Sequence, residues 1–111
     1  MTANEVINAA LSPLPYEISR PPARGDERVY VSWFEVDSRT VRQASNQRLR
    51  TEYLMQVDIY TKQPLIEQPD AVKDALRAAG LKIDHAGPED YEEDTGYRHL
   101  PIRCRWIRKE N

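Results

Sequence analysis

Apolar and polar residues alternate most regularly in the segment Leu49–Tyr60. One side of an extended chain there carries Leu49, Thr51, Tyr53, Met55, Val57 and Ile59. The other side carries Arg50, Glu52, Leu54, Gln56, Asp58 and Tyr60. Because successive side chains of a strand point to opposite faces, this pattern predicts a strand with one face on the core. The mixed second side is typical of partial exposure or of an interface.

Other segments also have the composition of strands. Val29–Val36 is rich in β-branched and aromatic residues, which predicts a central strand with both faces largely covered. Tyr97–Trp106 is predicted as the last strand, and Pro101 within it indicates an edge position or a bulge, because proline cannot donate a ladder hydrogen bond. Its inward residues are expected to be Leu100, Ile102, Cys104 and Trp106. Short strands are also expected at Tyr16–Ile18 and from Leu81 onward.

Two segments show helical spacing instead. Thr2 and Glu5 have the T-x-x-E pattern of a capping box, in which each side chain satisfies a free backbone donor. Apolar residues then recur at helical spacing, so we expect a helix over about residues 3–12. A second helix is predicted over about residues 69–79, because Pro69 suits the first helical position and Gly80 supplies a left-handed stop.

These elements predict a single domain over residues 1–111. A chain of 111 residues can bury roughly two thirds of its unfolded surface without help from a metal or a disulfide. The order of helix, strands, helix and strands favours an α+β fold. We expect an antiparallel or mixed sheet of about 4–5 strands with two helices packed on one face.

Charge is distributed unevenly along the chain, although the formal net charge is only −2. The segment Ser38–Arg50 holds four arginines and no acid, and most of it is predicted to be a polar loop over residues 37–48. The segment Asp84–Asp94 holds six acids. Arginine pairs persistently with carboxylates across interfaces. The candidate contact residues are therefore Arg39, Arg42, Arg48, Arg50, Glu89, Asp90, Glu92, Glu93 and Asp94. Solvated loops also collect charge, and that interpretation stays open.

Sequence patterns of catalysis are sparse. The four glycines match neither the dinucleotide-binding nor the Walker pattern. His85 and His99 have no zinc-binding motif around them, and Cys104 falls on a predicted inner face, where a thiol packs as a small apolar group. The acids at 89–94 lack the ligand spacing and the turn glycine of a calcium loop. We therefore expect no enzymatic activity, no metal and no cofactor.

The expected location follows from what the sequence lacks. No apolar run approaches the ~20 residues that a membrane helix needs, and the N-terminus has no basic region followed by an apolar one. Cys104 is the single cysteine, so no intramolecular disulfide can form. These features predict an unexported protein of a reducing cytoplasm with no membrane partner.

A nucleic-acid-binding regulator is the alternative from another functional class. Its arginines would contact phosphates, and exposed faces of Tyr30, Phe34 or Tyr60 would stack on bases. The chain has no aromatic and glycine motif of the kind that sheet-based RNA readers carry, and its acidic segment would repel a phosphate backbone. Sequence-specific nucleic-acid binding is therefore not expected.

Two stretches of the chain are distinctive: Gln56-Val57-Asp58-Ile59-Tyr60-Thr61 and Gly87-Pro88-Glu89-Asp90-Tyr91-Glu92-Glu93-Asp94-Thr95-Gly96, the second followed by Tyr97-Arg98-His99. They resemble the small tail terminator and tail completion proteins of long-tailed bacteriophages and prophages. The short capped helix and the alanine-rich helix that closes on Ala78-Ala79-Gly80 extend the resemblance over most of the chain. The resemblance implies a virion assembly protein without enzymatic activity.

In such a protein, a hexameric ring would cap the tail tube and present a docking surface to the head connector. The implied partners are other copies of the chain, the tail tube protein and the head-tail connector protein, with DNA passing through the ring. The implied location is the virion tail or neck, and the host cytoplasm during assembly. Head-tail joining, neck and minor capsid proteins remain alternatives. One hypothesis is that the arginine-rich segment 38–50 of one copy contacts the acidic segment 89–94 of the next, because a head-to-tail ring needs two complementary surfaces. It stays open whether these segments face a neighbouring copy, the lumen, the tube or the connector.

Overall fold

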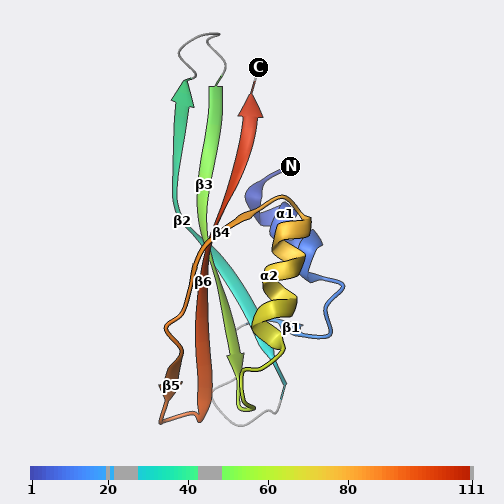
Figure 1. Cartoon of the computed structure of the whole chain (residues 1–111), viewed down its shortest axis with the longest axis vertical. Helices are drawn as coiled ribbons and strands as arrows, with labels where there is room; N and C mark the ends of the chain where they lie inside the picture. The colour runs from blue at the N-terminus through green and yellow to red at the C-terminus, as the bar shows by residue number, and fades with distance from the viewer. Residues whose placement is uncertain (20, 22–27, 43–48, 111) are drawn as a thin grey trace.

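The chain forms one twisted sheet with two helices on the same side of it (Figure 1). The computed structural model describes residues 1–19, 21, 28–42 and 49–110. The elements are α1 (Ala3–Leu11), β1 (Glu17–Ile18), β2 (Tyr30–Arg42), β3 (Leu49–Thr61), α2 (Gln68–Ala78), β4 (Lys82–Ala86), β5 (Asp90–Glu92) and β6 (Tyr97–Glu110). This arrangement confirms the predicted α+β class. Six strands are described where about 4–5 were expected: the short strand expected at Tyr16–Ile18 is β1, and the additional strand is β5, which lies in the predicted acidic loop.

The sheet is built around β3 and β6, which pair antiparallel from Leu49–Glu110 to Thr61–Arg98. The strand order is β1-β2-β3-β6-β4, and β5 pairs with β6 beyond the end of β4. All pairings are antiparallel except the two-residue parallel pairing of β1 with β2. The predicted alternation of β3 is confirmed, since Met55, Val57 and Ile59 are all buried.

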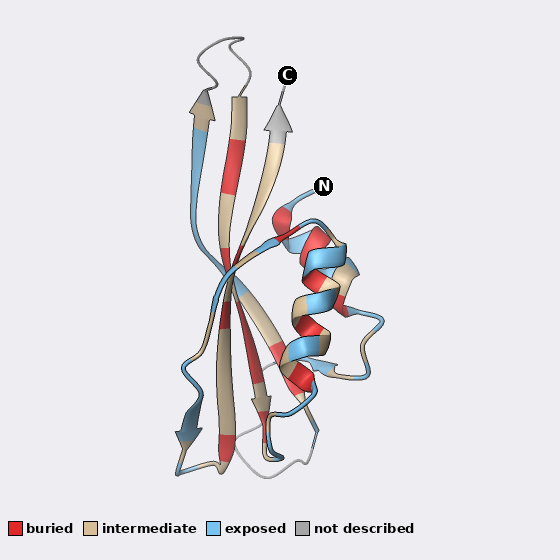
Figure 2. Ribbon diagram, in the orientation of Figure 1, coloured by how far each residue is buried: buried red, intermediate tan, exposed pale blue. Residues whose placement is uncertain are grey.

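The core lies between the helices and one face of the sheet (Figure 2). Ile7 and Leu76 project from the two helices and are fully buried, as are Val57 and Ile102 on the sheet. Cys104 lies in the same cluster, as its predicted inward position requires. The sheet therefore has a helix face, which is apolar, and an open face on its other side.

Local signals set the helix boundaries as predicted. Thr2 and Glu5 form the reciprocal capping box, with hydrogen bonds of 3.1 and 3.0 Å between side chains and backbone amides. The pKa of Glu5 is lowered, chiefly by the hydrogen bond from the Thr2 backbone amide. At the end of α2, Gly80 adopts a φ of 92°, a conformation that residues with a side chain rarely accept.

The expectations for β2 need correction. The strand continues to Arg42, so the predicted polar loop is wrong over residues 37–42; pairing with β3 supplies the hydrogen bonds that a solvated loop would have taken from water. The strand is also not central, because β1 covers only Tyr30 and Val31 of its outer edge. Phe34 and Val36 are 46% and 37% exposed, so the strand is not covered on both faces. Its ladder shifts register between Glu35 and Asp37.

Pro101 lies inside the sheet, opposite Asp58 of β3, and not at an edge as its missing donor had indicated. Its carbonyl accepts a 2.8 Å hydrogen bond from the amide of Gly87. The nitrogen and carbonyl of one strand residue point to the same side, so the proline nitrogen faces the connection between β4 and β5. The absent N–H group of Pro101 therefore faces the side on which the β4–β6 ladder has already ended. No hydrogen bond between β6 and β3 is lost.

The acidic segment is more ordered than the predicted loop. Residues 90–92 form β5 and pair with β6 in the register Asp90–His99 to Glu92–Tyr97. Residues 93–96 make the turn between the two strands, and Gly96 in this turn has a φ of 79°. We call β5, the turn and the start of β6 the acidic hairpin.

The molecule is elongated, with extents of 53 × 25 × 22 Å. The upper halves of β2, β3 and β6 extend past the helices as a three-stranded arm (Figure 1). We define this arm as residues 37–42, 49–54 and 105–110. Within the part of the chain that the structure describes, no helix is both long enough and apolar enough to cross a bilayer.

Candidate functional site

The open face of the arm gathers charged side chains from three strands. The register places Arg39 of β2 opposite Glu52 of β3, and Leu54 of β3 opposite Arg105 of β6. Residues 50, 52 and 54 share this face, because side chains alternate along a strand and Met55 and Val57 face the helices. The arm therefore presents a set of charges that cross-strand pairing, and not sequence proximity, brings together.

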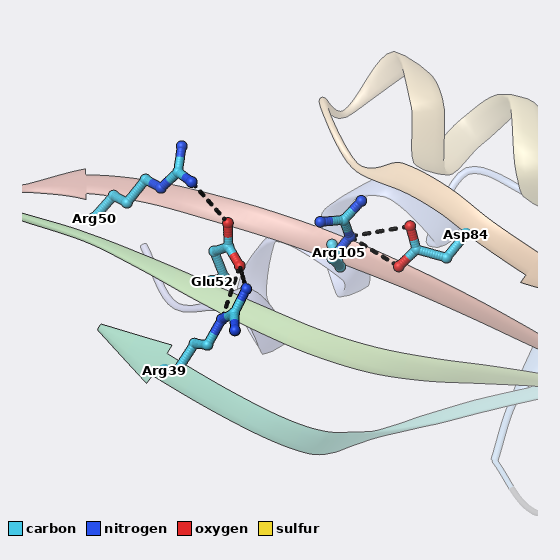
Figure 3. A network of polar contacts seen from close by, with 5 residues as sticks. All are labelled: Arg39, Arg50, Glu52, Asp84 and Arg105. Atoms are coloured by element: carbon cyan, nitrogen blue, oxygen red, sulfur yellow. Dashed lines mark hydrogen bonds and ion pairs between the residues drawn. The ribbon is translucent and has the colours of Figure 1, made fainter. Parts of the chain in front are cut away.

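Glu52 holds two arginines at once (Figure 3). Its Oε2 accepts from Nε and Nη2 of Arg39 at 3.2 and 3.1 Å, and its Oε1 lies 3.2 Å from Nη2 of Arg50. The carboxylate side chain is only 9% exposed, whereas that of Arg39 is 72% exposed. A shielded carboxylate thus fixes the direction of an exposed guanidinium, which reduces the entropy that Arg39 would lose on meeting a partner.

Arg105 is held in a similar way from the opposite side of the arm (Figure 3). Its Nε donates to both carboxylate oxygens of Asp84, at 3.0 and 2.9 Å. Asp84 lies at a register shift of β4, between the pairs formed by Ile83 and His85. At this irregularity in the ladder, the Asp84 carboxylate lies beside Arg105 of β6.

Between these charges the open face is hollowed and partly apolar. A cavity of about 230 Å³ is lined by Asp37, Ser38, Arg39, Glu52, Leu54 and Arg105. Leu54 forms its apolar part, and Phe34 lies diagonally across the β2–β3 ladder from Leu54. An apolar centre surrounded by charged groups is the usual composition of a protein–protein contact surface.

A second polar cluster lies lower on the open face. Asp58 is 4% exposed, and its Oδ1 accepts hydrogen bonds from Gln56 at 2.8 Å and from His99 Nε2 at 2.7 Å. Arg103 in turn donates to Gln56 at 2.7 Å. The His99 ring stacks on Tyr60, with centroids 4.5 Å apart and planes 6° apart.

This cluster changes the proton affinity of His99. The hydrogen bond to Asp58 raises the pKa of His99 most, and the charges of Asp58, Glu92 and Asp90 act in the same direction against the opposing effect of burial. These residues were not predicted as a site from the sequence. The available signal was the run of polar residues at alternate positions of β3.

The predicted contact residues fall at opposite ends of the molecule. Arg39 and Arg50 meet on Glu52 in the arm, whereas β5 lies at the far end of the sheet (Figure 1). Arg48 and the side chain of Arg42 lie outside the described residues. Of the predicted acids, Glu89 lies 3.7 Å from Arg98 and Glu92 accepts from Thr95; Asp90, Glu93 and Asp94 are exposed. The described residues of the two charged segments therefore lie far apart within one chain, and a contact between copies stays a prediction.

Cys104, the single cysteine of the sequence, is buried in the core. Burial raises the pKa of the Cys104 thiol to about 12, so the thiol stays protonated at neutral pH. Among the residues that the structure describes, no group of three or more histidine, cysteine or acidic side chains is placed to hold a metal ion. The arrangement on the open face is suited to holding charged and apolar groups of a partner.

Comparisons with known proteins give a similarity of fold. No protein-family model matches the sequence, and no curated protein matches it. A solved chain from the structure "Virion of native gene transfer agent (GTA) particle" is 17% identical with a TM-score of 0.51. The match covers 98% of this chain and 87% of that chain. The two chains share a fold over nearly the whole length of this one.

Proposed function

We propose that this chain is a virion assembly protein that acts by binding copies of itself and other proteins of the particle. The specific role proposed is that of a tail terminator, an oligomeric ring that caps the tail tube and offers a docking surface to the head connector. The fold shared with a chain of a gene transfer agent virion supports the general role. The motifs quoted from the sequence support the specific one.

The observation that carries the proposal is the arm. Beyond Val31, the outer edge of β2 pairs with no other strand among the residues that the structure describes, and just below the arm this strand exposes Phe34 and Val36. Soluble proteins usually shorten, cover or charge such an edge, because unpaired backbone groups and apolar side chains invite association. The edge of β2 is long and partly apolar, and it lies beside the hollowed, charged face of the arm. Binding of a protein partner explains this combination.

The charge arrangement favours protein partners over nucleic acid. Glu52 and Asp84 pair with Arg39, Arg50 and Arg105, so these guanidinium groups are directed by carboxylates that offset part of their charge. Phosphate backbones are bound mainly by the release of counterions from uncompensated positive charge. Carboxylates and amides of a partner protein are better matched to a surface with both signs.

The acidic hairpin at the other end gives this role a second surface. Arg39 and Arg50 lie in the arm and β5 lies at the other end of the sheet, so a contact between them would join copies end to end (Figure 1). A ring whose copies stand side by side would leave the hairpin free for the tail tube or the connector. In the proposed ring, the hairpin therefore meets another component of the particle.

Electron microscopy of the purified protein, with and without tail tubes, tests the proposal. We expect rings that sit on the tube ends and prevent further tube growth. Charge reversal by Arg39→Glu together with Arg50→Glu should weaken this capping while the circular dichroism spectrum stays that of the parent. A protein that stays monomeric beside tubes and connectors, or that binds DNA in a salt-dependent way without forming a ring, would contradict the proposed function.

A further inference from the structure

The helix layer carries an apolar groove that no side chain of the described chain fills. It lies between α1 and α2 at the foot of the arm and has a volume of about 540 Å³. Ala9 and Ala10 contribute from α1, Ala75 and Ala78 from α2, and Trp106 from β6. Small side chains on both helices keep this groove open, and Trp106 closes the end that adjoins the arm.

An exposed aromatic side chain stands on the opposite face of the sheet. Phe34 pairs with Gln56 in the ladder, whereas its neighbour Trp33 packs toward the helices and donates a 2.6 Å hydrogen bond to Asn4 of α1. Alternation along β2 therefore directs Phe34 to the open face. It is 46% exposed, and the described part of the chain places no strand beside β2 on its outer edge at this position. Phe34 and the groove thus form a projection and a recess on two different sides of one chain.

We propose that Phe34 of one copy inserts into the groove between α1 and α2 of the next copy, and that this is the lateral contact of the assembly. The inference rests on the proposed function, because it names the surfaces through which the copies associate. A projection and a recess on different faces cannot make a symmetric dimer with each other. They make a head-to-tail contact, which closes into a ring when the rotation between copies permits it.

The size and chemistry of the two surfaces support this pairing. An apolar cavity of about 150 Å³ is enough to bind benzene, so a groove of about 540 Å³ accepts the Phe34 ring and leaves room for neighbouring atoms of β2. The segment around Phe34 is acidic, with Glu35 and Asp37 beside it. On α2, Arg77 lies next to Ala78; its side chain is 57% exposed and lies 3.7 Å from Asp74 of the same helix. Arg77 is therefore a basic group on the recess side that can meet the acids beside Phe34.

The surface area that a stable interface buries sets a minimum size for this contact. A stable interface buries about 800 Å² on each partner, which is more than one phenylalanine supplies. The hollowed open face around Leu54, Arg39 and Arg105 must then lie within the same contact. Phe34 would be the buried anchor, and the paired arginines would form its polar rim.

The test uses two variants that each remove one side of the contact. Phe34→Glu removes the projection and keeps the groove, and Ala78→Trp fills the groove and keeps the projection. Both positions are exposed, so both variants should fold like the parent. Phe34→Leu and Ala78→Ser are the matched controls. We expect each blocking variant alone to self-associate at least about tenfold more weakly than the parent, with the controls close to the parent.

A mixture of the two blocking variants gives the sharper result. One copy keeps its groove and the other keeps its Phe34, so together they retain one intact contact and should form a 1:1 complex in native mass spectrometry. A mixture that stays monomeric while the parent forms rings would overturn this inference and leave the proposed function standing. Blocking variants that assemble like the parent would do the same. A parent protein that never associates, even beside tail tubes, would overturn both.

Paired cysteines provide a readout that does not depend on the blocking variants. A chain with Phe34→Cys and Ala78→Cys should form an oxidised ladder of dimers, trimers and larger species, since each copy links to two neighbours. Cys104 is buried and should not contribute. Cross-linked dimers from the Phe34→Cys variant alone would indicate a symmetric contact and would contradict the inference, as would the absence of a ladder in an assembled sample.

Discussion

Replacement of His99 by phenylalanine isolates the electrostatic part of the Asp58 cluster. A phenyl ring keeps the stack on Tyr60, which has a centroid separation of 4.5 Å, but it has no nitrogen to donate to Asp58. Asp58 is nearly buried and keeps only the hydrogen bond from Gln56 among the side-chain bonds described for it. The substitution therefore removes one donor from a carboxylate that has little access to water.

The magnitude follows from the chemistry of that one contact. A hydrogen bond to a charged group contributes about 1.5–3 kcal/mol, and the lower half of that range applies because the His99 side chain is 21% exposed. Neutral imidazole still donates to the carboxylate, but the attraction between two opposite charges is then absent, so the contact is weaker at high pH. We therefore expect the His99→Phe variant to lose about 2 kcal/mol at low pH and about 1 kcal/mol at high pH.

The contribution of His99 to the free energy of unfolding depends on pH because folding shifts the pKa of this residue. The pKa of His99 is raised in the folded protein, first by the hydrogen bond to Asp58 and then by the charges of Asp58, Glu92 and Asp90. Folding is then favoured by protonation. The extra stability is fully present below the pKa of an unfolded histidine, about 6.5, and it disappears as the pH rises through the higher folded pKa.

Urea denaturation over a series of pH values between about 5 and 9 measures this effect. The difference in unfolding free energy between the parent and His99→Phe should shrink as the pH rises. His85→Phe is the matched control, because His85 is exposed. A constant difference across the series, or one that grows with pH, would refute the argument from the Asp58 contact.

Three further substitutions or treatments test the fold. Ile102→Ala should lower the free energy of unfolding by about 2–5 kcal/mol, because Ile102 is fully buried and its loss leaves a cavity; a loss below 1 kcal/mol, measured by urea denaturation, would contradict its central position. Gly80→Ala should cost about 1–2 kcal/mol through backbone strain alone, since φ is 92° and nothing lies within 4 Å of an added methyl group; Gly80→Asn should cost less by the same measurement, and equal effects would argue against the strain. Cys104 should react with a thiol reagent only as fast as the protein opens, because burial raises its pKa to about 12; rapid labelling of the native protein would contradict its placement in the core.

Elements defined by local rules were predicted well. The capping box needs only Thr2 and Glu5, and both of its hydrogen bonds form. The stop of α2 needs only a residue that accepts positive φ, and Gly80 does so. The face of β3 that contacts the helices was also predicted, because alternation with a period of two depends on no partner strand.

The length of β2 was missed because its end depends on β3. Residues 37–42 are mostly polar, and this composition predicted a loop. In the structure each of them pairs with a residue of β3, such as Thr40 with Thr51. Pro101 was expected at an edge or a bulge for a similar reason. Its missing N–H group is evident from the sequence, but only the end of β4 at Ala86 leaves this position without a required hydrogen bond.

The candidate site was predicted only in its composition. The sequence singled out Arg39 and Arg50 by their charge, and Glu52 appeared only as one polar residue of a strand. The register brings Glu52 within 3.2 Å of both, although Arg39 lies 13 positions away along the chain. Asp58 and His99 are 41 positions apart and were not connected at all before the strands were paired.

The sequence by itself determined the helices, the stops and the apolar side of β3, because each depends on residues a few positions apart. Only the tertiary structure decided where the paired arginines point, how Asp58 raises the pKa of His99, and that Phe34 and the groove lie on opposite sides of the sheet. Contacts of this kind depend on strand register and on the twist of the sheet. Both are set by the packing of the whole chain, so no short segment contains them.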